Sequence, residues 1–566
     1  MKEKIRDNKK GMGTCQKGTL FVKGVPFWHV PIIVLVMATC FLSTAHANNI
    51  KVTNCQLINM LPDAQSTTAD IQFDISWENS WRYGTVLYDA AWVFAKVSVN
   101  DGAWSHATIS GVTSVGASGT GLTIDVPTDN KGAFLYRSTA DTGTLSTTAV
   151  KLQWNRIADS VAYNATKVKI EVFAIEMVHV PQGSFYVGDG TARISATNSH
   201  FFDAASSAGA AVRIISSAPY ISNVSDGTGT AGDITWVNES TYAGNLPTSR
   251  TQLSSSFPTG YNSFYMMKYE VTQGQYRDFL NTLTRTQQNA RTGTSLGVGV
   301  TSVTNTYVLS GTSDLRCRNG IRCNATIHTS NPITFYCDLN GNNIGNESTD
   351  GEWIACDYLE WVDLCAYADW AGLRPMTELE FEKACRGPKA VLAGEYAWGT
   401  TSITRPHDLS NAGANNEIAS DSGANCVYSN SGDINGALRS GFAATSGTVT
   451  RGATGASYYG IMELSGNIFE KLVSVMGSQT DTTVSTFTGL NGNGSLSLSG
   501  NANVDYWPGN NGTNGVNGEV TGVSGSGYRG GRWYAGAELA CVSNRYSAAY
   551  SVKIVYGIGG RCVRTQ

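Results

Sequence analysis

The sequence predicts an α+β protein with two folded parts. A small all-β sandwich domain is expected over residues 48–175, and a larger α+β domain over residues 176–566. Apolar and polar residues alternate at period two in the first part, as they do in half-buried strands. Helix-capping signals occur in the second part. Glycine is abundant, with 62 residues, and only 15% of residues are charged, which suits β-rich or loop-rich α+β folds better than helical bundles.

The N-terminus has the pattern of an export signal. Residues 1–47 are rich in lysine, and the apolar run Val30–Leu42 is followed by small residues at Ala45–Ala47, where cleavage is expected. The run is too short to cross a bilayer comfortably. We therefore predict a signal peptide over residues 1–47 and a mature chain without a transmembrane span that is secreted, periplasmic or at the cell surface. The alternatives are an uncleaved anchor and a lipid anchor at Cys40, which Thr39 disfavours.

The charge of the chain argues against a nucleic-acid partner. The net charge is −4, and seven of the basic residues lie in the predicted signal peptide, so the mature chain is more acidic than the whole. No basic surface for a phosphate backbone remains. We expect an unidentified protein or glycan as the ligand.

The cysteines fit an exported protein. An oxidising compartment usually turns such a set into disulfides. The spacing of Cys317 and Cys323 is longer than the two to about four residues that separate paired zinc ligands. We therefore predict structural disulfides among the cysteines after residue 47. These are Cys55, Cys317, Cys323, Cys337, Cys356, Cys365, Cys385, Cys426, Cys541 and Cys562.

The sequence pattern of residues 48–175 predicts an accessory β-domain. The stretches Ala69–Trp77 and Lys167–Ala174 place apolar side chains on one face at period two. Turns that contain Asn, Gly and Asp separate such stretches, as in an antiparallel sandwich. The tryptophans are expected to pack in the core rather than to form a platform for sugars. They are Trp77, Trp81, Trp92, Trp104 and Trp154.

Three helices are predicted in the second part. The first lies within Tyr269–Leu280, with Thr272 as its N-cap and with Tyr276, Phe279 and Leu280 on one face. The second lies within residues 361–372. The third lies within residues 373–387, where a threonine followed three residues later by a glutamate forms a capping box at Thr377 and Glu380.

These helices belong to a series of motifs that resembles one family. The motifs begin with the strand-turn-strand Met177–Gly188, continue through the three helices, and end with Glu395–Gly399, Tyr459–Glu470 and the closing segment Arg529–Arg564. Their type and order resemble the formylglycine-generating-enzyme, or sulfatase-modifying-factor, family. The resemblance implies a C-type-lectin-like α+β fold for residues 176–566. The glycine- and serine-rich insertions at residues 189–260, 282–330 and 475–525 are expected to be surface loops.

The residues that carry the family's reaction are incomplete. The resemblance implies an oxidation of a substrate cysteine by copper and oxygen, with two copper-binding cysteines after an Arg-Gly-Gly-Ser motif. In this chain those positions are Ala535 and Ala540 or, with one inserted residue, Gly536 and Cys541, and Arg532 replaces the serine. One thiolate makes a poor Cu(I) site. We therefore do not expect copper, and Cys541 is a catalytic candidate only if the chain is active.

The resemblance also implies two disulfides, one between Cys365 and Cys562 and one between Cys385 and Cys541. The sequence alone does not determine this connectivity.

Other enzyme classes lack their signatures as well. The related iron-dependent sulfoxide synthases need a histidine cluster, and the seven histidines of this chain include no His-x3-His pair. The nucleophile elbow of a hydrolase is also missing from the sequence. An enzymatic function therefore depends on fold analogy alone.

Two segments are candidate calcium sites. The first resembles a dockerin or EF-hand loop, although a strict match needs glycine at Asn343 and an acid at Thr349. An Asn- and Gly-rich turn held by its own side-chain hydrogen bonds is the alternative. The family resemblance implies a second site at Asn467 and Glu470, and calcium at either site would rigidify loops. The ligands in the first loop would be Asp338, Asn340, Asn342, Ile344 and Asp350.

The closing segment has a second resemblance, to the variable proteins of diversity-generating retroelements. Small and aromatic residues alternate there between Arg-Gly-Gly and Gly-Gly-Arg-Cys anchors. Tyrosine offers a large contact area at low entropic cost, which suits a binding face. Ordinary strand packing is the alternative. The predicted face consists of Arg532, Trp533, Tyr534, Glu538, Asn544, Tyr546, Tyr550, Lys553 and Tyr556.

Two functions therefore remain. The leading hypothesis is an exported, catalytically inactive member of the family that acts as a ligand-binding or surface-assembly module, with a diversified binding face as its extension. The alternative is a copper-dependent formylglycine-generating oxidase that acts on sulfatase cysteines.

Overall fold

The computed structural model describes most of the chain after the predicted signal peptide. The predicted signal peptide, residues 1–47, lies outside the described residues. No helix among the described residues is long and apolar enough to cross a membrane. The described residues are 49–61, 65–117, 121–191, 199–237, 242–430, 432, 434–445, 448, 450–480, 482–551 and 556–566.

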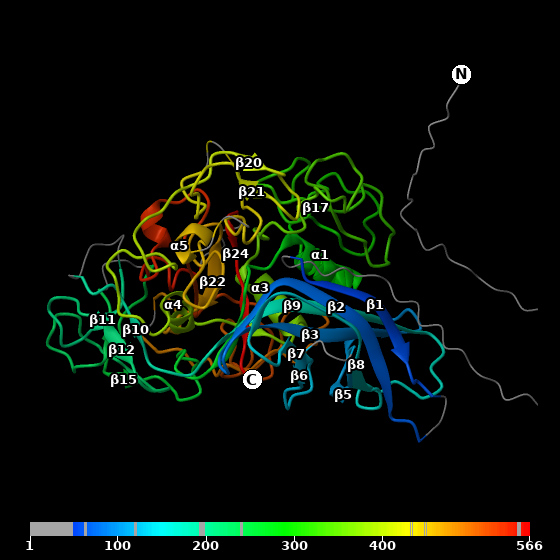
Figure 1. The fold of residues 1–566 in the computed structure, drawn as a ribbon, viewed down its shortest axis with the longest axis horizontal. Coiled ribbons are helices and arrows are strands. Elements are labelled where there is room, and N and C mark those ends of the chain that lie inside the picture. Colours follow the sequence, from blue (N-terminus) through cyan, green and yellow to red (C-terminus); the bar gives the residue numbers. More distant parts are fainter. Residues whose placement is uncertain are drawn as a thin grey trace, which may run out of the picture. The chain divides into compact units, whose positions relative to one another are not determined.

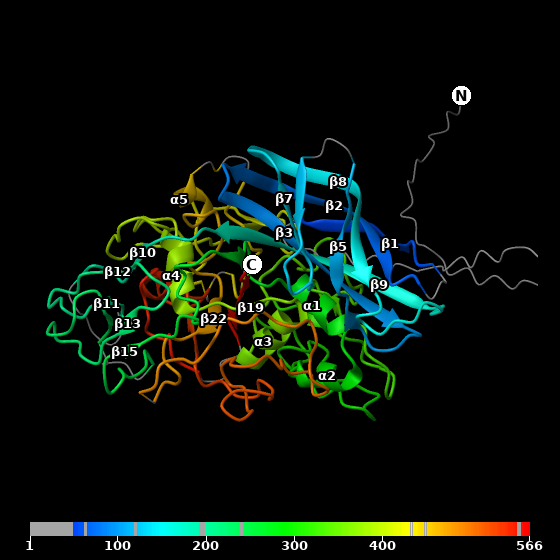
Figure 2. The same cartoon turned by 90° about the horizontal axis from the view of Figure 1, so that it is seen from below.

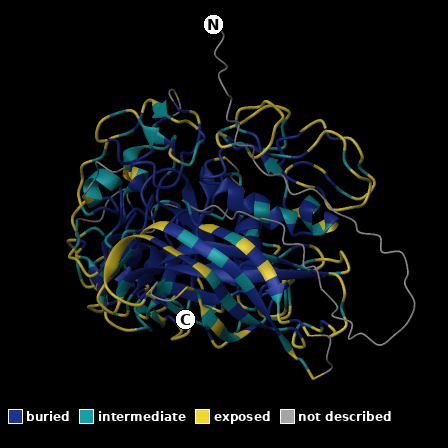
Figure 3. Ribbon diagram, turned by 45° about the vertical axis from the view of Figure 1, so that its right-hand side comes forward, coloured by how far each residue is buried: buried dark blue, intermediate teal, exposed yellow. Residues whose placement is uncertain are grey.

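The first layer is an antiparallel group of four strands. β2 pairs with both β1 and β8, and β8 pairs with β5. Along β2 the residues Ile71, Phe73, Ile75 and Trp77 are buried and their neighbours are partly exposed, which confirms the predicted period of two. Figure 3 shows this alternation along the strands. The strands are β1 (Lys51–Ile58), β2 (Thr68–Tyr83), β5 (Ile109–Val115) and β8 (Asp141–Asn155).

The second layer faces the first and is buried on both sides. In β3, Ala91 and Val93 belong to the core between the two layers, whereas Trp92 and Phe94 point to the opposite core. A strand with this environment reads as a nearly continuous apolar run, and β3 has one from Ala90 to Ala95, flanked by the buried Asp89 and Lys96. The strands of this layer are β3 (Leu87–Val99), β4 (Ser105–His106), β6 (Leu122–Asp125), β7 (Ala133–Arg137) and β9 (Val168–Val180).

β9 connects the two predicted domains. It pairs with β3 from Val168 to Val178, and its last four residues, Met177 to Val180, pair with β16 (Phe264–Met267). The sheet then continues through β25 (Cys562–Arg564) to β19 (Arg374–Pro375), so that it has twelve strands. The boundary predicted between residues 175 and 176 therefore lies inside a strand. The described residues belong to one compact unit.

The predicted helices are present and cover the second face of this sheet. Thr272 and Thr377 are N-caps, as expected, and both have complete capping boxes, of which only the one at Thr377 was predicted. The ring of Trp370 lies 5.0 Å from that of Phe94 and 5.3 Å from that of Phe279, so β3 and two helices share one core (Figures 1 and 2). The α-helices are α1 (Gln273–Asn281), α2 (Arg285–Ala290), α3 (Trp361–Trp370), α4 (Glu378–Arg386) and α5 (Arg451–Thr454).

The insertions contribute more than surface loops. Phe201, Trp236 and Trp507 are almost fully buried and belong to the main core. Short strands order these segments, because a buried backbone needs hydrogen-bond partners. The strands within the insertions are β11 (Phe202–Asp203), β12 (Val212–Ile214), β13 (Tyr220–Ile221), β14 (Ile234–Thr235), β15 (Thr251–Gln252) and β17 (Ile321–Arg322). The short strands β10 (Phe185–Val187), β18 (Tyr336–Cys337), β20 (Leu409–Ser410) and β21 (Ile418–Ala419) lie outside the insertions.

A three-stranded sheet carries the closing segment. β22 (Phe469–Val473) pairs with β23 (Ser526–Arg529) on one side and with β24 (Ile558–Gly559) on the other. Arg529 at the end of β23 pairs with Glu378 and Glu382 of α4, and Arg561 pairs with Glu470 of β22. These side chains are fully buried, so removing one partner would leave an uncompensated charge. The Arg-Gly-Gly and Gly-Gly-Arg-Cys motifs are therefore structural anchors.

Candidate functional site

A tight turn brings Arg532 out of the sheet. Gly530 and Gly531 have φ values of 91° and 78°, which favour glycine. A Cβ on Gly531 would lie 2.9 Å from the Cα of Ala540, so the chain also needs glycine there for space. The turn places Arg532 beside β22 and in front of the 3-10 helix η1 (Ala537–Ala540).

The Arg532 guanidinium lies among aromatic rings. Its Cζ is 3.8 Å from the ring centre of Tyr534, 5.1 Å from that of Phe469 and 5.9 Å from that of Tyr556. The Nε and Nη1 groups are buried and have no hydrogen-bond partner among the described residues. Burial lowers the pKa of Arg532, yet a guanidinium remains charged at neutral pH. The site therefore holds a cation whose Nε and Nη1 donors are unused and shielded from solvent.

Trp533 lies beneath this surface rather than on it. Its side chain is only 3% exposed, so its place in the predicted binding face is wrong. Its backbone N–H donates to Asn467 O, and its carbonyl accepts from the N–H of Asn430 at 2.7 Å. The indole N–H of Trp533 and both polar atoms of the Asn430 amide are also buried without a partner among the described residues. Sequence reasoning missed Asn430, because it lies about a hundred residues earlier in the chain.

A second aromatic group adjoins the first. Tyr550 lies 4.3 Å from the ring of Tyr242 and 5.8 Å from that of Tyr528. Tyr528 in turn lies 4.6 Å from Phe469, which also contacts Arg532. The partly exposed Tyr546 packs against the same Tyr242 at 5.5 Å. The two groups thus form one continuous aromatic network.

The remaining predicted face residues differ in exposure. Glu538 is exposed and Tyr556 is 45% exposed, as a binding face requires. Asn544 is only 7% exposed, and its side-chain N–H donates to Glu538 O at 3.0 Å. The prediction of Asn544 as a face residue is therefore wrong, because this amide holds the turn that follows η1. Lys553 lies outside the described residues.

The positions that correspond to the family's copper ligands do not fit copper. Cys541 is a half-buried thiol that contacts Gly394 O at 3.6 Å, and burial raises its pKa to about 11. Cys541 packs against a small cluster that contains Cys426, whose thiol pKa burial also raises. The thiol of Cys426 donates to Ser465 O at 3.1 Å. Cu(I) prefers thiolates, whereas both groups are neutral thiols at neutral pH.

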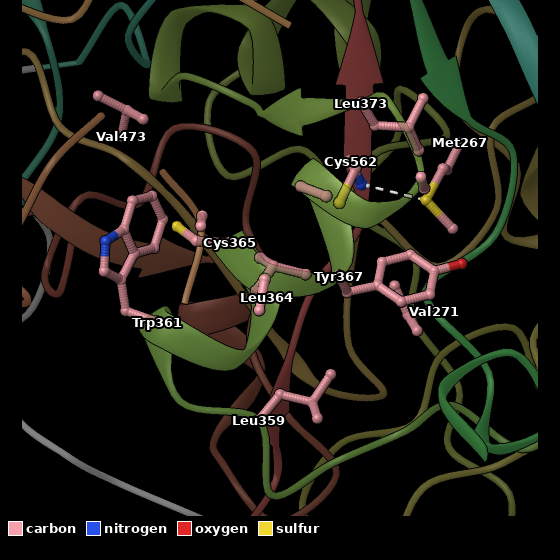
Figure 4. Packing of buried hydrophobic residues seen from close by; sticks show 14 of the residues in the cluster. Met267, Val271, Leu359, Trp361, Leu364, Cys365, Tyr367, Leu373, Val473 and Cys562 are labelled. Atoms are coloured by element: carbon pink, nitrogen blue, oxygen red, sulfur yellow. Dashed lines mark hydrogen bonds between the residues drawn. The ribbon is translucent and has the colours of Figure 1, made fainter. Parts of the chain in front are cut away.

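The structure does not show the predicted disulfides. All ten cysteines among the described residues are free. Cys365 and Cys562 lie in the main core, where the N–H of Cys562 donates to the sulfur of Met267 at 3.2 Å (Figure 4). Cys385 packs in one apolar cluster and Cys541 against another. The cysteines of the implied pairs are therefore free thiols in apolar surroundings, three of them buried and Cys541 half-buried.

The Asp338 loop is held by its own hydrogen bonds. The Asp338 carboxylate accepts the backbone N–H groups of Asn342 and Asn343, both at 3.1 Å, and pairs with Arg322. The amide oxygens of Asn340 and Asn342 accept backbone N–H groups at 2.9 and 2.7 Å. The side chain of Ile344 is 59% exposed. These contacts match the hydrogen-bonded turn that was the alternative to calcium.

One oxygen of this loop remains unmatched. Asp350 is fully buried, and its Oδ2 accepts the N–H of Glu347 at 2.7 Å, but its Oδ1 has no partner among the described residues. The described part of the chain contains no group of three or more His, Cys, Asp or Glu that could hold a metal ion. The calcium prediction at this loop stays a prediction.

The second candidate site, at Asn467 and Glu470, does not fit a calcium ion. Both oxygens of Glu470 accept from Arg561, at 2.6 and 2.8 Å. The Asn467 amide oxygen accepts the N–H of Leu438 at 2.8 Å, and its N–H donates to Glu270 at 2.6 Å. A guanidinium therefore occupies the place where a calcium ion would need carboxylate oxygens.

The fold and site define an α+β protein in which arginine-anchored strands present an aromatic surface. A family model described as the sulfatase-modifying factor enzyme 1-like domain matches residues 241–566. The match spans more than half of the chain, which therefore belongs to this family. Among curated proteins the chain has no match.

Proposed function

We propose that this protein is exported and acts as a ligand-binding or surface-assembly module rather than as an oxidase. Residues 176–566 serve as a C-type-lectin-like scaffold in this proposal, and residues 48–175 form an accessory β-sandwich. The lysine-rich start with its apolar run supports a secreted, periplasmic or cell-surface location.

The observation that carries the proposal is the state of Arg532. A buried donor without a partner costs about 1–3 kcal/mol, which a ligand with acceptor oxygens would recover. The planar guanidinium matches a carboxylate with two parallel hydrogen bonds. The rings of Tyr534 and Tyr556, which stack 5.1 Å apart, offer an apolar surface beside it. A protein or glycan ligand with a carboxylate would satisfy both features.

The state of the thiols supports a binding role over oxidation. Cys541 has no cysteine at the first copper position, where Ala535 or Gly536 stands. Its raised pKa leaves little thiolate at neutral pH. Neither observation favours the alternative, a copper-dependent oxidase that acts on sulfatase cysteines.

The mixture of small and aromatic residues supports an extension of the proposal, in which the closing segment is diversified. Tyr546, Tyr550 and Tyr556 are partly or well exposed, and small residues separate the first two. A reverse-transcriptase gene nearby, with a near-repeat of the codons for residues 529–564, would establish diversification. Without such a gene, the closing segment would bind a single fixed ligand or a structural partner.

Substitution of Arg532 tests the proposal. The mature chain is applied to an array of peptides and glycans with and without carboxylates, and the affinity for each bound probe is then measured for Arg532→Met. We expect at least about a tenfold loss of affinity, because a charge-assisted hydrogen bond is removed. Arg213→Met is the matched control, since Arg213 is exposed and also lies over a tyrosine, at 5.8 Å.

Two outcomes would contradict the proposal. The first is that no carboxylate-bearing probe binds, or that binding is unchanged in Arg532→Met. The second is that protein loaded with Cu(I) converts a Cys-x-Pro-x-Arg peptide to its formylglycine product, which would establish the oxidase alternative.

A further inference from the structure

A pocket lies away from the Arg532 surface. It has a volume of about 740 Å³ and is formed by the end of β2, the start of β3 and the segment from Arg451 to Gly460. Its lining shares no residue with the Arg532 surface. A volume of this size is typical of sites for small molecules.

Aromatic side chains from both sides line the pocket. Trp81 and Tyr83 lie 5.5 Å apart at the end of β2, and Tyr83 is 61% exposed. Tyr458 and Tyr459 lie 4.9 Å apart, edge to face, on the opposite segment. Gly460 fits against Trp81, because a Cβ on Gly460 would lie 3.7 Å from the indole ring. Exposed aromatic faces of this kind stack on the apolar faces of ligand rings.

The pocket also contains an arginine with an unused donor. Arg451 is fixed by a hydrogen bond from its Nη2 to Ala397 O at 3.0 Å, and its Cζ lies 5.5 Å from the ring of Tyr458. Its Nε is buried without a partner among the described residues. Lys389 is exposed, and its Nζ lies 5.9 Å from the same tyrosine ring. Two cations thus flank one side of the pocket.

The rest of the lining is polar and free of acids. Arg451 is the only charged residue among the lining residues, and Leu87 is the only aliphatic one larger than glycine. Aromatic rings provide most of the apolar surface, which suits the face of a ligand ring, and the lining lacks the carboxylates that a cationic ligand would need. It combines stacking surfaces with hydroxyl and amide groups, which is the chemistry that a sugar ring requires.

We propose that this pocket binds an acidic saccharide. The sugar rings stack on Trp81, Tyr83 and Tyr458, and the carboxylate of a uronic or sialic acid residue accepts from Arg451. The sandwich part then contributes directly to recognition, because Trp81 and Tyr83 belong to β2. In this proposal Trp81 forms part of a platform for sugars rather than serving only in packing.

Calorimetric titration of the mature chain tests the proposal. The probes are oligosaccharides of galacturonic acid, of glucuronic acid and of sialic acid, each paired with a neutral counterpart. We expect at least one acidic probe to bind about tenfold more tightly than its neutral counterpart, because only the acid pairs with Arg451. Tyr83→Ser and Arg451→Met should each weaken that binding by about tenfold.

The controls separate loss of the site from loss of the fold. Tyr163→Ser removes a tyrosine that is 41% exposed and not part of the pocket, so it should leave the affinity unchanged. Each variant is compared with the wild type by circular dichroism. The proposal is overturned if no acidic probe binds, if neutral and acidic probes bind equally well, or if binding survives both pocket substitutions in folded protein.

Discussion

At the scale of single residues, the partners of the buried arginines distinguish those that hold the fold together from those that are candidates for ligand contacts. Arg529 and Arg561 have carboxylate partners and serve the fold. The Nε of Arg529 is also buried without a partner, but Arg532 and Arg451, which have such donors too, form no ion pair among the described residues. Sequence reasoning found Arg532 through the family motif, because it replaces a serine there. It could not find Arg451 or Asn430, since no local pattern marks a donor whose acceptor is missing.

Asp357 leads to a prediction about pH. It is fully buried, and burial raises its pKa to about 7, although it accepts from Gly557 and Asn319. An unfolded aspartic acid has a pKa of about 3.9. The folded chain therefore favours the protonated acid. Its contribution to stability is complete below about pH 4 and is lost as the pH rises through about 7.

Asp357→Asn should flatten this dependence. Between about pH 4 and 7 the free energy of unfolding of the wild type is expected to fall by up to about 1.4 kcal/mol per pH unit more than that of the variant. The reason is that the folded wild type binds up to one more proton at Asp357 than the unfolded chain. Urea denaturation at several pH values measures the slope of the free energy of unfolding against pH. The prediction concerns this slope and not the absolute stability. Parallel slopes for wild type and variant would show that Asp357 stays ionised in the folded chain.

At the scale of elements, local signals succeeded where the cause was local. The capping box at Thr377 was predicted from residues three positions apart, the N-cap at Thr272 from its residue type, and both are present. The strands of the first part were predicted from alternation along a single segment. The Asp338 loop shows the limit, because a calcium loop and a self-bonded turn use the same Asp and Asn side chains.

We propose that the Asp338 loop binds calcium, because Oδ1 of the buried Asp350 has no partner among the described residues. A calcium ion there would be held by Asp338, Asn340, Asn342 and Asp350, and it would rigidify the loop. We expect millimolar calcium to raise the melting temperature of the wild type, because ligand binding to the folded state stabilises it. Asp350→Asn should abolish this shift, whereas Asn467→Ala should lower stability without changing the calcium response.

Differential scanning calorimetry with and without a chelator measures both effects. A melting temperature that is unchanged by calcium in the wild type would leave the loop as a hydrogen-bonded turn. A shift of equal size in Asp350→Asn would place the calcium elsewhere.

At the scale of the whole molecule, β9 makes the two parts depend on each other. One face of the β3–β9 layer covers the sandwich core, and the other covers α1 and α3. Trp92 illustrates this coupling, because its indole N–H donates to Ala371 O at 2.8 Å and Arg564 lies 4.1 Å over its ring. Removal of either part would expose a largely apolar sheet face.

We therefore predict one cooperative unfolding transition for the mature chain. Far-ultraviolet circular dichroism, which reports mainly on backbone structure, and tryptophan fluorescence should give coincident curves. Trp92→Ala should lower the whole transition by about 3–5 kcal/mol, because it opens a cavity in the shared core. Trp104→Ala, at a partly exposed position, should have a much smaller effect. Two separate transitions, with only the first shifted by Trp92→Ala, would contradict the shared-sheet interpretation.

The sequence by itself determined the capped helices, the strand-rich first part and the family, because each depends on patterns within short segments. Only the tertiary structure decided that β9 spans the predicted boundary, that Trp533 and Asn544 are buried, and that the four paired cysteines of the prediction are free thiols. The same holds for the pocket between β2 and the segment after α5. These features depend on contacts between residues far apart in the chain, and such contacts leave no periodic trace in either segment.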